Sequence, residues 1–496
     1  MNDKAYDVIV VGAGNAALCA ALSAREQGAK VLVLERAPLE KRGGNTAFAG
    51  GVFRTVYNGL EDVLRFIPDT SEDQIANTDF GSYSADEYFD DLYRVTHHRI
   101  DPDLAEVLVR SSHETLGWIQ SKGIRFIAHY GFNALKHEGR FKFFGGQIFE
   151  AVGGGRGLSD AEFKAAEKRG IVVRYATRAS ALIEGRGGIE GVRVITDRVA
   201  EDIRAPAVVL ACGGFEANRE WRTRYLGPGW DLAKVRGSSY NTGDGIGMAL
   251  AIGAQPAGHW SGAHACAWDL NSPEFGDLDI GDRYSKHGYT SGVVLNANGL
   301  RFMDEGEDFF NMTYAKYGRV ILEQPGQSAW QVFDSKVLHL LDPRYRTRQV
   351  TKVTANTLEE LAAKLEGVNQ RQALQTLREY NAAVNPGARF NPTVLDGCST
   401  SGLAIPKSNW ALALDTPPFE AFAVTCGITF TFGGLKISTD AEVIDMEHKA
   451  IPGLYAAGEL VGGVFYFNYP GGAGLMNGAV FGRRAGQNAA RHAGSR

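Results

Sequence analysis

The sequence predicts an α/β protein in which a doubly wound parallel sheet is interrupted by an inserted α+β domain. At both ends of the chain, short apolar runs alternate with glycine-rich turns and helical stretches, which is the pattern of βαβ units. From about residue 259 to residue 410 the glycine clusters thin out, and tryptophan, tyrosine and histidine become denser. We therefore expect residues 1–258 and 411–496 to form one domain and residues 259–410 to form a capping domain.

The first βαβ unit occupies about 30 residues at the start of the chain. Residues 6–11 form a continuous apolar run, and the turn GAGNAA follows it. A helical pattern then runs from Ala16 to Gln27, and a second apolar run, KVLVLE, ends at Glu35. This order predicts two neighbouring parallel strands with a helix packed across them.

The later segments continue the alternation of helices and strands. Residues 71–123 have helical periodicity, and within them we expect Asp101 to cap a helix whose first residue is Pro102. In the inserted segment, residues 358–384 are expected to be helical throughout. The other expected elements are a helix within 152–170, a strand at 171–177, a hairpin around 187–188, a strand at 207–214, strands in ISTDAEVI and GLYAAGEL, and a final helix from about 475 to 491.

Charge and cysteine content exclude several classes of protein. The net charge of −5 gives no global basic field for nucleic acid. The five cysteines are odd in number and widely spaced, without C-x-x-C, so we expect no disulfide framework, haem, iron–sulfur cluster or other metal. No apolar run reaches the ~18 residues that span a bilayer, and residues 1–6 lack a signal-peptide pattern. We expect a cytoplasmic protein without a membrane span.

The turn after the first strand has the dinucleotide-binding pattern G-x-G-x-x-A. Gly12 permits the tight turn, Gly14 lets the backbone approach a pyrophosphate, and Ala17 is small enough for helix and strand to pack. Glu35 ends the second strand, where a carboxylate can accept hydrogen bonds from ribose hydroxyls. The pattern predicts a dinucleotide with a free ribose 2′-hydroxyl and argues against NADP.

A second motif near the C-terminus indicates that the dinucleotide is FAD. A strand ends in Gly458-Glu459, an arrangement that commonly places the carboxylate on a flavin ribityl chain. The start of the last helix, at Gly474-Leu475, can then meet the flavin edge where negative charge builds on reduction. A cofactor that both ends of the chain contact must be long, as FAD is.

With these motifs in place, the sequence resembles the fumarate reductase/succinate dehydrogenase flavoprotein superfamily over nearly its whole length. The resemblance implies a Rossmann-like FAD-binding domain of the glutathione-reductase type with a capping domain. The segments GNAALCAAL, GRFKFFGG and FYFNYPGG resemble the FAD-dependent tricarballylate dehydrogenase branch, and Δ1-ketosteroid dehydrogenases share the Tyr-Pro-Gly before the last helix. Other matching segments are RGGNTAFAGG, ACGGFEAN, NTGDGIGMA, NGLRFMDE, FGGLKISTDAEVI, IPGLYAAGEL and GGAGLMNGAVFGRRAG.

The resemblance also implies which residues hold FAD and how. Membrane-bound members attach FAD through a histidine where this chain has Asn45, so we expect non-covalent FAD. The residues expected to contact FAD are Gly12, Gly14, Asn15, Ala16, Glu35, Arg36, Arg42, Gly43, Gly44, Asn45, Thr46, Gly50, Gly51, Thr177, Cys212, Gly213, Asp244, Gly458, Glu459, Gly474 and Leu475.

The chain departs from the soluble fumarate reductases at three catalytic positions. Phe309 stands where the family's motif has a proton-donating arginine, and Thr429 stands where it has a substrate-binding histidine. Tyr469 replaces the second substrate arginine. Fumarate reduction by the usual residues is therefore not expected. Tyr469 instead matches the ketosteroid dehydrogenases, in which this tyrosine helps to polarise a carbonyl.

Desaturation beside a carbonyl or carboxylate needs a group that stabilises enolate charge, a base for the α-proton and an acceptor for the β-hydride. Tyr469 is the first candidate, although it could also be a packing residue. Tyr289, Tyr466 and His287 are secondary candidates, each with packing or an ordinary loop position as the alternative. The remaining candidates are Arg140 with Lys142, as a carboxylate clamp or a solvated strand face, and Arg301, as a site residue or in an ion pair with Asp304 or Glu305.

The sequence therefore predicts an FAD-dependent dehydrogenase that desaturates a small carboxylate or carbonyl compound between its α and β carbons. The resemblance favours the conversion of tricarballylate to cis-aconitate. A desaturase of a cyclic ketone, such as a 3-ketosteroid or an oxocyclohexane acid, is an alternative, and so is a non-catalytic flavin protein for electron transfer or sensing. Because the chain has no metal-binding cysteine pattern, electrons must leave to an external acceptor: a quinone, oxygen or an iron–sulfur partner protein.

Overall fold

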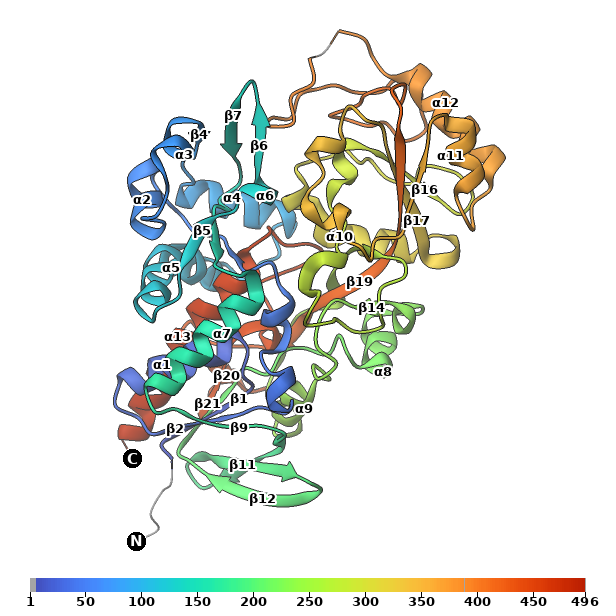
Figure 1. The fold of residues 1–496 in the computed structure, drawn as a ribbon. Coiled ribbons are helices and arrows are strands. Elements are labelled where there is room, and N and C mark those ends of the chain that lie inside the picture. Colours follow the sequence, from blue (N-terminus) through green and yellow to red (C-terminus); the bar gives the residue numbers. More distant parts are fainter. Residues whose placement is uncertain (1–5, 388, 496) are drawn as a thin grey trace.

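A six-stranded sheet with strand order β20-β21-β13-β1-β2-β9 forms the lower part of the molecule in Figure 1. In this computed structural model, which describes residues 6–387 and 389–495, all neighbouring strands of the sheet are parallel except the pair β20–β21. The strands span Val8–Val11 (β1), Val31–Leu34 (β2), Val172–Arg174 (β9), Ala207–Leu210 (β13), Glu442–Ile444 (β20) and Ala450–Ala456 (β21). This mixed α/β sheet confirms the predicted fold class.

The centre of the sheet follows directly from the first βαβ motif. All four residues of β1 are buried, as a central parallel strand requires. Gly12 then turns the chain with φ +106°, and a Cβ there would lie 2.3 Å from the carbonyl oxygen of Ala211 on the neighbouring strand segment. Only glycine fits this turn, after which α1 (Asn15–Glu26) begins.

Helix α13 (Ala473–Gly494) packs along α1 and brings the C-terminal segment to the N-terminal motif. Two glycines of α13 permit the close approach, because a Cβ at Gly482 or Gly486 would lie 2.4 or 2.0 Å from a backbone oxygen of α1. Helices α5 (Pro102–Ser121) and α7 (Gly154–Lys168) flank this pair, as Figure 1 shows. The first and last parts of the chain thus form one layer over the sheet.

The expected start of α5 is confirmed in detail. The Asp101 side chain accepts hydrogen bonds from the backbone N–H groups of Asp103 and Leu104, at 3.0 and 3.3 Å, and Pro102 occupies the first turn. The other helices of this half are α2 (Gly59–Phe66), α3 (Glu72–Ala76), α4 (Ala85–Val95), α6 (Tyr130–Asn133), α8 (Arg219–Trp221) and α9 (Asp244–Ala251). Its small sheets contain β3 (Val52–Phe53), β4 (Thr78–Asp79), β5 (Phe126–Ala128), β6 (Ala134–His137), β7 (Arg140–Phe143), β8 (Phe149–Ala151), β10 (Arg178–Gly185), β11 (Gly188–Thr196) and β12 (Val199–Arg204).

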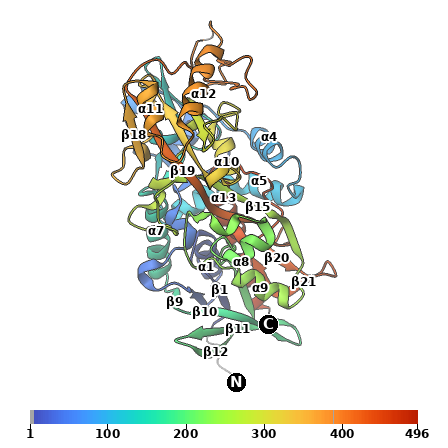
Figure 2. The same cartoon turned by 90° about the vertical axis from the view of Figure 1, so that its right-hand side faces the viewer.

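A second, mostly antiparallel sheet is built around the long strand β19 (Phe419–Leu435), which runs from the upper to the lower half of the molecule in Figures 1 and 2. Strand β19 pairs with β14, β15, β17 and β18. The other elements of this half are β14 (Lys234–Val235), β15 (Pro256–Asp269), β16 (Val293–Asn296), β17 (Ser328–Phe333), β18 (Lys352–Ala355), α10 (Phe310–Leu322), α11 (Leu358–Lys364) and α12 (Gln370–Ala383).

Strand β19 lies in the segment 411–496 but pairs with strands of the segment 259–410. The division into 1–258, 259–410 and 411–496 therefore stays a prediction. The expectation of one helix over 358–384 is wrong, because the chain breaks between α11 and α12. Gly367 has φ +71° there, and the Asn369 side chain caps α12 by accepting from the N–H of Gln372 at 3.1 Å.

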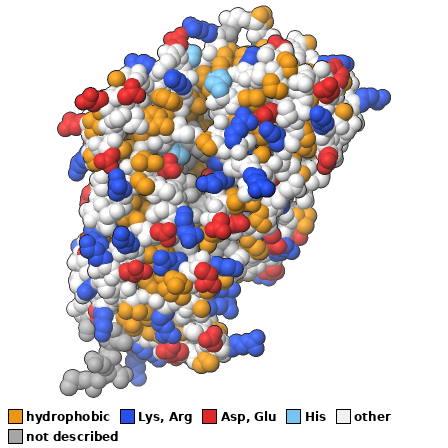
Figure 3. All heavy atoms as spheres, in the orientation of Figure 1, with side chains coloured by type: hydrophobic (Ala, Val, Ile, Leu, Met, Phe, Trp, Pro, Cys, Tyr) orange, Lys and Arg blue, Asp and Glu red, His pale blue; other side chains and the backbone are white. Residues whose placement is uncertain are grey.

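The surface carries mixed charge on the face shown in Figure 3, where acidic and basic side chains are interspersed. This face therefore presents no extended basic area of the kind that nucleic acid requires. Within residues 6–387 and 389–495, no helix is long and apolar enough to cross a membrane. The expectation about a signal peptide concerns mainly residues 1–5, which lie outside the described part of the chain.

Candidate FAD and substrate site

One cavity of about 980 Å³ runs between the two sheets. Its volume lies at the upper end of the range for small-molecule and cofactor sites. Residues from the first βαβ unit, including Gly12 and Glu35, line one part of it, and residues from the end of the chain, including Glu459 and Leu475, line another. The cavity therefore joins the two motifs that the sequence separates by more than 400 residues.

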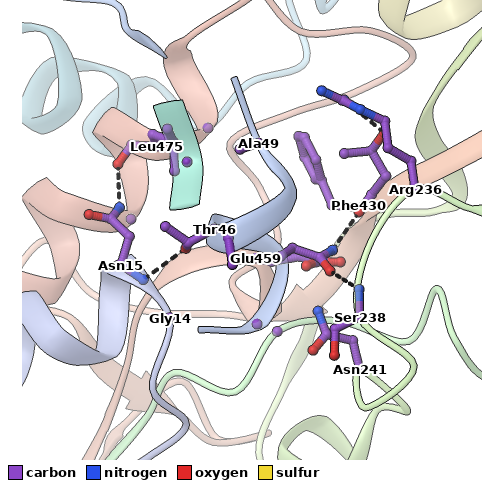
Figure 4. A pocket seen from close by; sticks show the side chains of 18 of the residues that line it. Gly14, Asn15, Thr46, Ala49, Arg236, Ser238, Asn241, Phe430, Glu459 and Leu475 are labelled. Atoms are coloured by element: carbon purple, nitrogen blue, oxygen red, sulfur yellow. Dashed lines mark hydrogen bonds between the residues drawn. The ribbon is translucent and has the colours of Figure 1, made fainter. Parts of the chain in front are cut away.

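Direct hydrogen bonds hold these segments together around the cavity, as Figure 4 shows. The backbone N–H of Asn15 donates to Oγ1 of Thr46 at 2.9 Å, and the Asn15 side-chain amide donates to the carbonyl oxygen of Leu475 at 2.8 Å. One residue at the start of α1 thus connects a loop near residue 46 with the first turn of α13.

The phosphate-binding end of the cavity has the features that a pyrophosphate needs. The N-cap residue of α1 is Gly14, which has no side chain, so apart from the N–H of Asn15 the N–H groups of the first turn are left for a ligand at the positive end of the helix dipole. A Cβ at Gly14 would lie 3.3 Å from Oγ1 of Thr46 and would narrow the space. The backbone shape and the uncapped helix both fit the expected dinucleotide.

Glu35 and Asp244 line the cavity near this end in different environments. Burial raises the pKa of Glu35 to about 7, although the backbone N–H of Ala37 donates to its carboxylate at 2.7 Å. Asp244, by contrast, is held in ion pairs with Arg36 and Arg178, each at 2.9 Å. Glu35 thus retains acceptor capacity toward a ribose, while Asp244 fixes the arginines at the rim.

A buried pair of carboxyl groups lies farther along the cavity. Glu459 accepts from the backbone N–H of Thr431 at 2.9 Å, and Glu216 accepts from the side-chain amides of Asn45 and Asn241 at 2.7 and 2.6 Å. Burial and the neighbouring Glu216 carboxyl raise the pKa of Glu459 well above its ordinary value. The pair therefore carries a proton at neutral pH and can both donate to and accept from ribityl hydroxyls.

The opposite end of the cavity is formed by aromatic side chains around the N-terminus of α13. Phe430 and Tyr469 line the cavity beside Gly474, and the Tyr469 hydroxyl shares a hydrogen bond with that of Tyr314. His264 packs against this pair. Its ring centroid lies 4.8 to 5.2 Å from the ring centroids of Tyr469, Tyr314 and Phe430. Figure 4 shows Phe430 between Glu459 and Arg236.

His264 is fully buried, and neither of its ring nitrogens has a hydrogen-bond partner among the described residues. Burial lowers its pKa well below the ordinary value, so the imidazole is neutral. Burial also raises the pKa of Tyr469 and that of Tyr314, so both phenols keep their protons. An unpaired buried imidazole costs stability, which indicates a role other than packing.

Most residues expected to contact FAD line the cavity. They are Gly12, Gly14, Asn15, Ala16, Glu35, Arg36, Gly44, Asn45, Thr46, Gly50, Gly51, Thr177, Cys212, Gly213, Asp244, Gly458, Glu459, Gly474 and Leu475. Two lie outside its lining. Arg42 stacks on Phe163 at 4.1 Å instead, and Gly43 turns the chain with φ +105° where a Cβ would meet the hydroxyl of Ser159.

The seven catalytic candidates separate into two groups. Tyr469 and His287 line the cavity. The other five are not among its lining residues. Tyr289 is buried with its hydroxyl bonded to Thr313 at 2.7 Å, and the Tyr466 ring stacks on His259 at 6.0 Å. Arg140 and Lys142 lie on the β6–β7 hairpin, where Arg140 is exposed, and Arg301 donates to the Glu305 carboxylate at 3.1 Å. For Arg301 the structure therefore shows the ion-pair alternative.

Several lining residues were not predicted. Arg236, Asp282, Arg344 and Tyr314 all face the cavity, together with Phe430. They come from separate segments of the chain and belong to no shared sequence motif. Only the position of Arg236, six residues before the turn Thr242-Gly243-Asp244, could have drawn attention to it.

The comparisons extend over nearly the whole chain. The family described as FAD binding domain matches residues 7–475. A probable fumarate reductase of Shewanella frigidimarina is 29% identical over 507 residues, covering 98% of this chain and 75% of the relative. A 3-oxosteroid 1-dehydrogenase of Mycobacterium tuberculosis is 26% identical over 592 residues, covering 100% of both. The open conformation of a flavocytochrome c3 fumarate reductase superposes with a TM-score of 0.73 at 27% identity, covering 99% of this chain and 79% of that chain.

Proposed function

The chain belongs to the FAD binding domain family and is an FAD-dependent oxidoreductase, and from this premise we propose that it desaturates a small carboxylate or carbonyl compound between its α and β carbons. The resemblance to the fumarate reductase/succinate dehydrogenase superfamily, with ketosteroid dehydrogenases as neighbours, is confirmed, and so is FAD as the cofactor. The likeness to the tricarballylate branch stays a prediction.

The observation that carries the proposal is the hydrogen-bonded pair of Tyr469 and Tyr314 at the α13 end of the cavity, with His264 behind it. When bound, FAD supplies the acceptor for the hydride that leaves the β carbon. The protein must then stabilise the oxygen of the substrate and take up the α-proton.

The two protonated phenols and the neutral imidazole divide these tasks. Tyr469 donates a hydrogen bond to the substrate oxygen while enolate charge develops and keeps its proton, because its raised pKa keeps the phenol neutral at pH 7. His264 has an acceptor nitrogen without a partner and lies against both phenols. The imidazole is therefore the group to which we assign the α-proton, while both phenols keep their own protons.

The leading substrate is tricarballylate, which would give cis-aconitate. Tyr469 supports the desaturation of a cyclic ketone as well, because a ketone oxygen can accept the same hydrogen bond. A non-catalytic flavin protein for electron transfer or sensing is the third alternative. It is disfavoured because the relatives are oxidoreductases and because an unpartnered histidine lies next to the tyrosine pair.

The experiment that separates these functions is anaerobic mixing of the FAD-loaded protein with each compound. Tricarballylate is expected to bleach the flavin and to yield one equivalent of cis-aconitate per FAD, whereas a 3-ketosteroid is expected to leave the flavin oxidised. Bleaching by the ketosteroid alone would favour the cyclic-ketone alternative. A flavin that stays oxidised with every acid and ketone would favour the non-catalytic one.

Cofactor attachment, electron acceptor and location belong to the same proposal. Asn45 lines the cavity, and an amide forms no covalent link to FAD, so we expect acid precipitation to release all the flavin into solution. Reduced FAD must pass its electrons to a quinone, oxygen or an iron–sulfur partner protein. The cytoplasm is the location we expect.

A further inference from the structure

Besides the tyrosine pair, a second polar cluster lines the same cavity. We propose that Arg236, held in place by Asp282 and Arg344, binds a carboxylate of the substrate other than the group that faces Tyr469. The substrate is then an acid with at least two carboxylate groups. This inference rests on the proposed desaturation and adds the chemical class of its substrate.

The three residues come from separate loops that meet at the cavity. Arg236 follows β14, Asp282 lies in the turn Gly281–Tyr284, and Arg344 lies in the turn Pro343–Arg346. The Arg236 Nε donates to Oδ1 of Asp282 at 2.7 Å, and Nη1 of Arg344 donates to Oδ2 of the same carboxylate at 2.9 Å. Asp282 therefore connects the two guanidinium groups.

This arrangement fixes Arg236 but does not use all of its donors. Besides Asp282, its one other partner among the described residues is Oγ1 of Thr429, at 3.2 Å from Nη1. One N–H on each terminal nitrogen is left without a partner, although the side chain is only 8% exposed. A buried guanidinium with donors left over on both terminal nitrogens can bind a carboxylate.

The electrostatic environment also favours an anion at this place. Although burial would raise the pKa of Asp282, the charges of Arg236 and Arg344 hold it below the ordinary value, so Asp282 stays ionised. Burial lowers the pKa of the neighbouring His287 well below its ordinary value, and the positive charges of both arginines lower it further. The charges of both arginines therefore act on a neighbouring side chain of the cavity lining, although both arginines also pair with Asp282.

The position of Arg236 relative to Tyr469 determines the substrate class. Arg236 donates to Thr429, and the next residue, Phe430, packs on the Tyr469 ring at 5.1 Å, so the guanidinium and the tyrosine pair line the same part of the cavity. In agreement, the charge of Arg236 counteracts the effect of burial on the pKa of both Tyr469 and Tyr314. The tyrosine pair and His264 are uncharged and suit the oxygen that is activated. A full positive charge nearby is suited to a second group, which carries a full negative charge.

The test is a calorimetric titration of the dithionite-reduced holoenzyme, in which the reduced flavin cannot accept a hydride and binding is measured without turnover. The probes are tricarballylate and the monocarboxylate butyrate, and the variants are Arg236→Gln and Arg236→Lys. The control is Arg319→Gln, which removes an exposed arginine paired with Glu323 on α10. The FAD content of each variant reports whether the site is intact.

We expect Arg236→Gln to raise the Kd for tricarballylate about 10- to 100-fold, because it removes hydrogen bonds to a charged group. Arg236→Lys, which keeps the positive charge but not the planar guanidinium with its paired donors, is expected to bind tricarballylate about tenfold more weakly. Butyrate binding and the control variant should be unchanged. Equal Kd values for tricarballylate in the wild type and Arg236→Gln would overturn the inference, and so would the absence of tricarballylate binding to the wild type.

The result distinguishes this inference from the proposed function. Tricarballylate that binds through Arg236 but never bleaches the oxidised flavin would contradict desaturation of that acid and leave the carboxylate site intact. Tricarballylate that bleaches the flavin with the same half-saturating concentration in Arg236→Gln would support desaturation and overturn the carboxylate site.

Discussion

Replacing Gly486 by alanine tests whether the contact between α1 and α13 holds the cavity together. A Cβ at this position would lie 2.0 Å from the carbonyl oxygen of Ala20, a backbone atom that cannot rotate away. An ordinary contact begins at 3.4 Å, so the two helices must separate locally by about 1.4 Å. The hydrogen bond from Asn15 to the carbonyl of Leu475, at 2.8 Å, spans the same two helices and would be stretched or lost.

The expected cost follows from these distances. Overpacking of this kind destabilises proteins by about 1–3 kcal/mol, and a similar loss in the FAD complex corresponds to about tenfold weaker binding for each 1.4 kcal/mol. Thermal unfolding of the apoprotein and a fluorescence titration with FAD measure the two effects. We expect Gly486→Ala to lower the Tm by several degrees and to weaken FAD binding about tenfold.

The matched control is Gly494→Ala in the same helix, where a Cβ meets nothing within 4 Å. This change replaces glycine by a better helix former and should leave the Tm unchanged or slightly higher. The reasoning would be refuted if Gly486→Ala bound FAD and unfolded like Gly494→Ala. It would then follow that the cavity does not depend on the close approach of the two helices.

Three further changes test the site itself. Tyr469→Phe should keep FAD but slow anaerobic flavin bleaching about 100-fold. Tyr314→Phe, which breaks the same hydrogen bond, should slow bleaching less. Equal bleaching rates in the wild type and Tyr469→Phe would exclude a catalytic role for the Tyr469 hydroxyl. His264→Phe should raise the apoprotein stability by about 1–3 kcal/mol, because it removes unpaired buried nitrogens, and it should slow flavin bleaching. A fall in both the stability and the bleaching rate would mean that His264 has a packing role. Glu35 has a pKa raised from 4.5 to about 7 by burial, so its neutral form stabilises the apoprotein below pH 4.5 and this contribution is lost as the pH rises through 7. FAD binding, which uses the ionised form, should strengthen about tenfold from pH 6 to pH 8 in the wild type and stay constant in Glu35→Gln.

The cofactor half of the site could be predicted because its physical requirements are local. A tight turn at Gly12 and an uncapped helix at Gly14 are fixed by neighbouring residues in the sequence, and the motif therefore marks them directly. The carboxylates at Glu35 and Glu459 follow buried strands, whose ends must meet at one edge of a parallel sheet. Nineteen of the expected FAD residues consequently line one cavity.

The substrate half could not be predicted in the same way, because it depends on contacts between distant segments. Arg236, Asp282 and Arg344 approach one another only after the two sheets and their connecting turns have formed. His264 lies in β15 opposite Phe430 of β19, and nothing in its sequence neighbourhood distinguishes it from an ordinary strand residue. The domain boundaries were hard to predict for the same reason, because β19 pairs with β17, which lies more than 80 residues earlier in the chain.

Arg301 shows the limit for a single residue. The sequence allowed both a role in the site and an ion pair with a neighbouring carboxylate, because the Gly-x-Arg-Phe motif is compatible with either role. The choice depends on where Glu305 points. In the structure this carboxylate is fully buried and accepts from the Arg301 guanidinium and from the backbone N–H of Val294.

The electron density of crystals grown with FAD tests most directly whether the two ends of the chain hold one cofactor beside the tyrosine pair. We predict one FAD per chain, with its adenosine ribose at Glu35, its ribityl chain at Glu459 and its isoalloxazine ring between Leu475 and Tyr469. Density that places the isoalloxazine ring away from Tyr469, or that leaves Glu459 without any contact to the cofactor, would contradict the account.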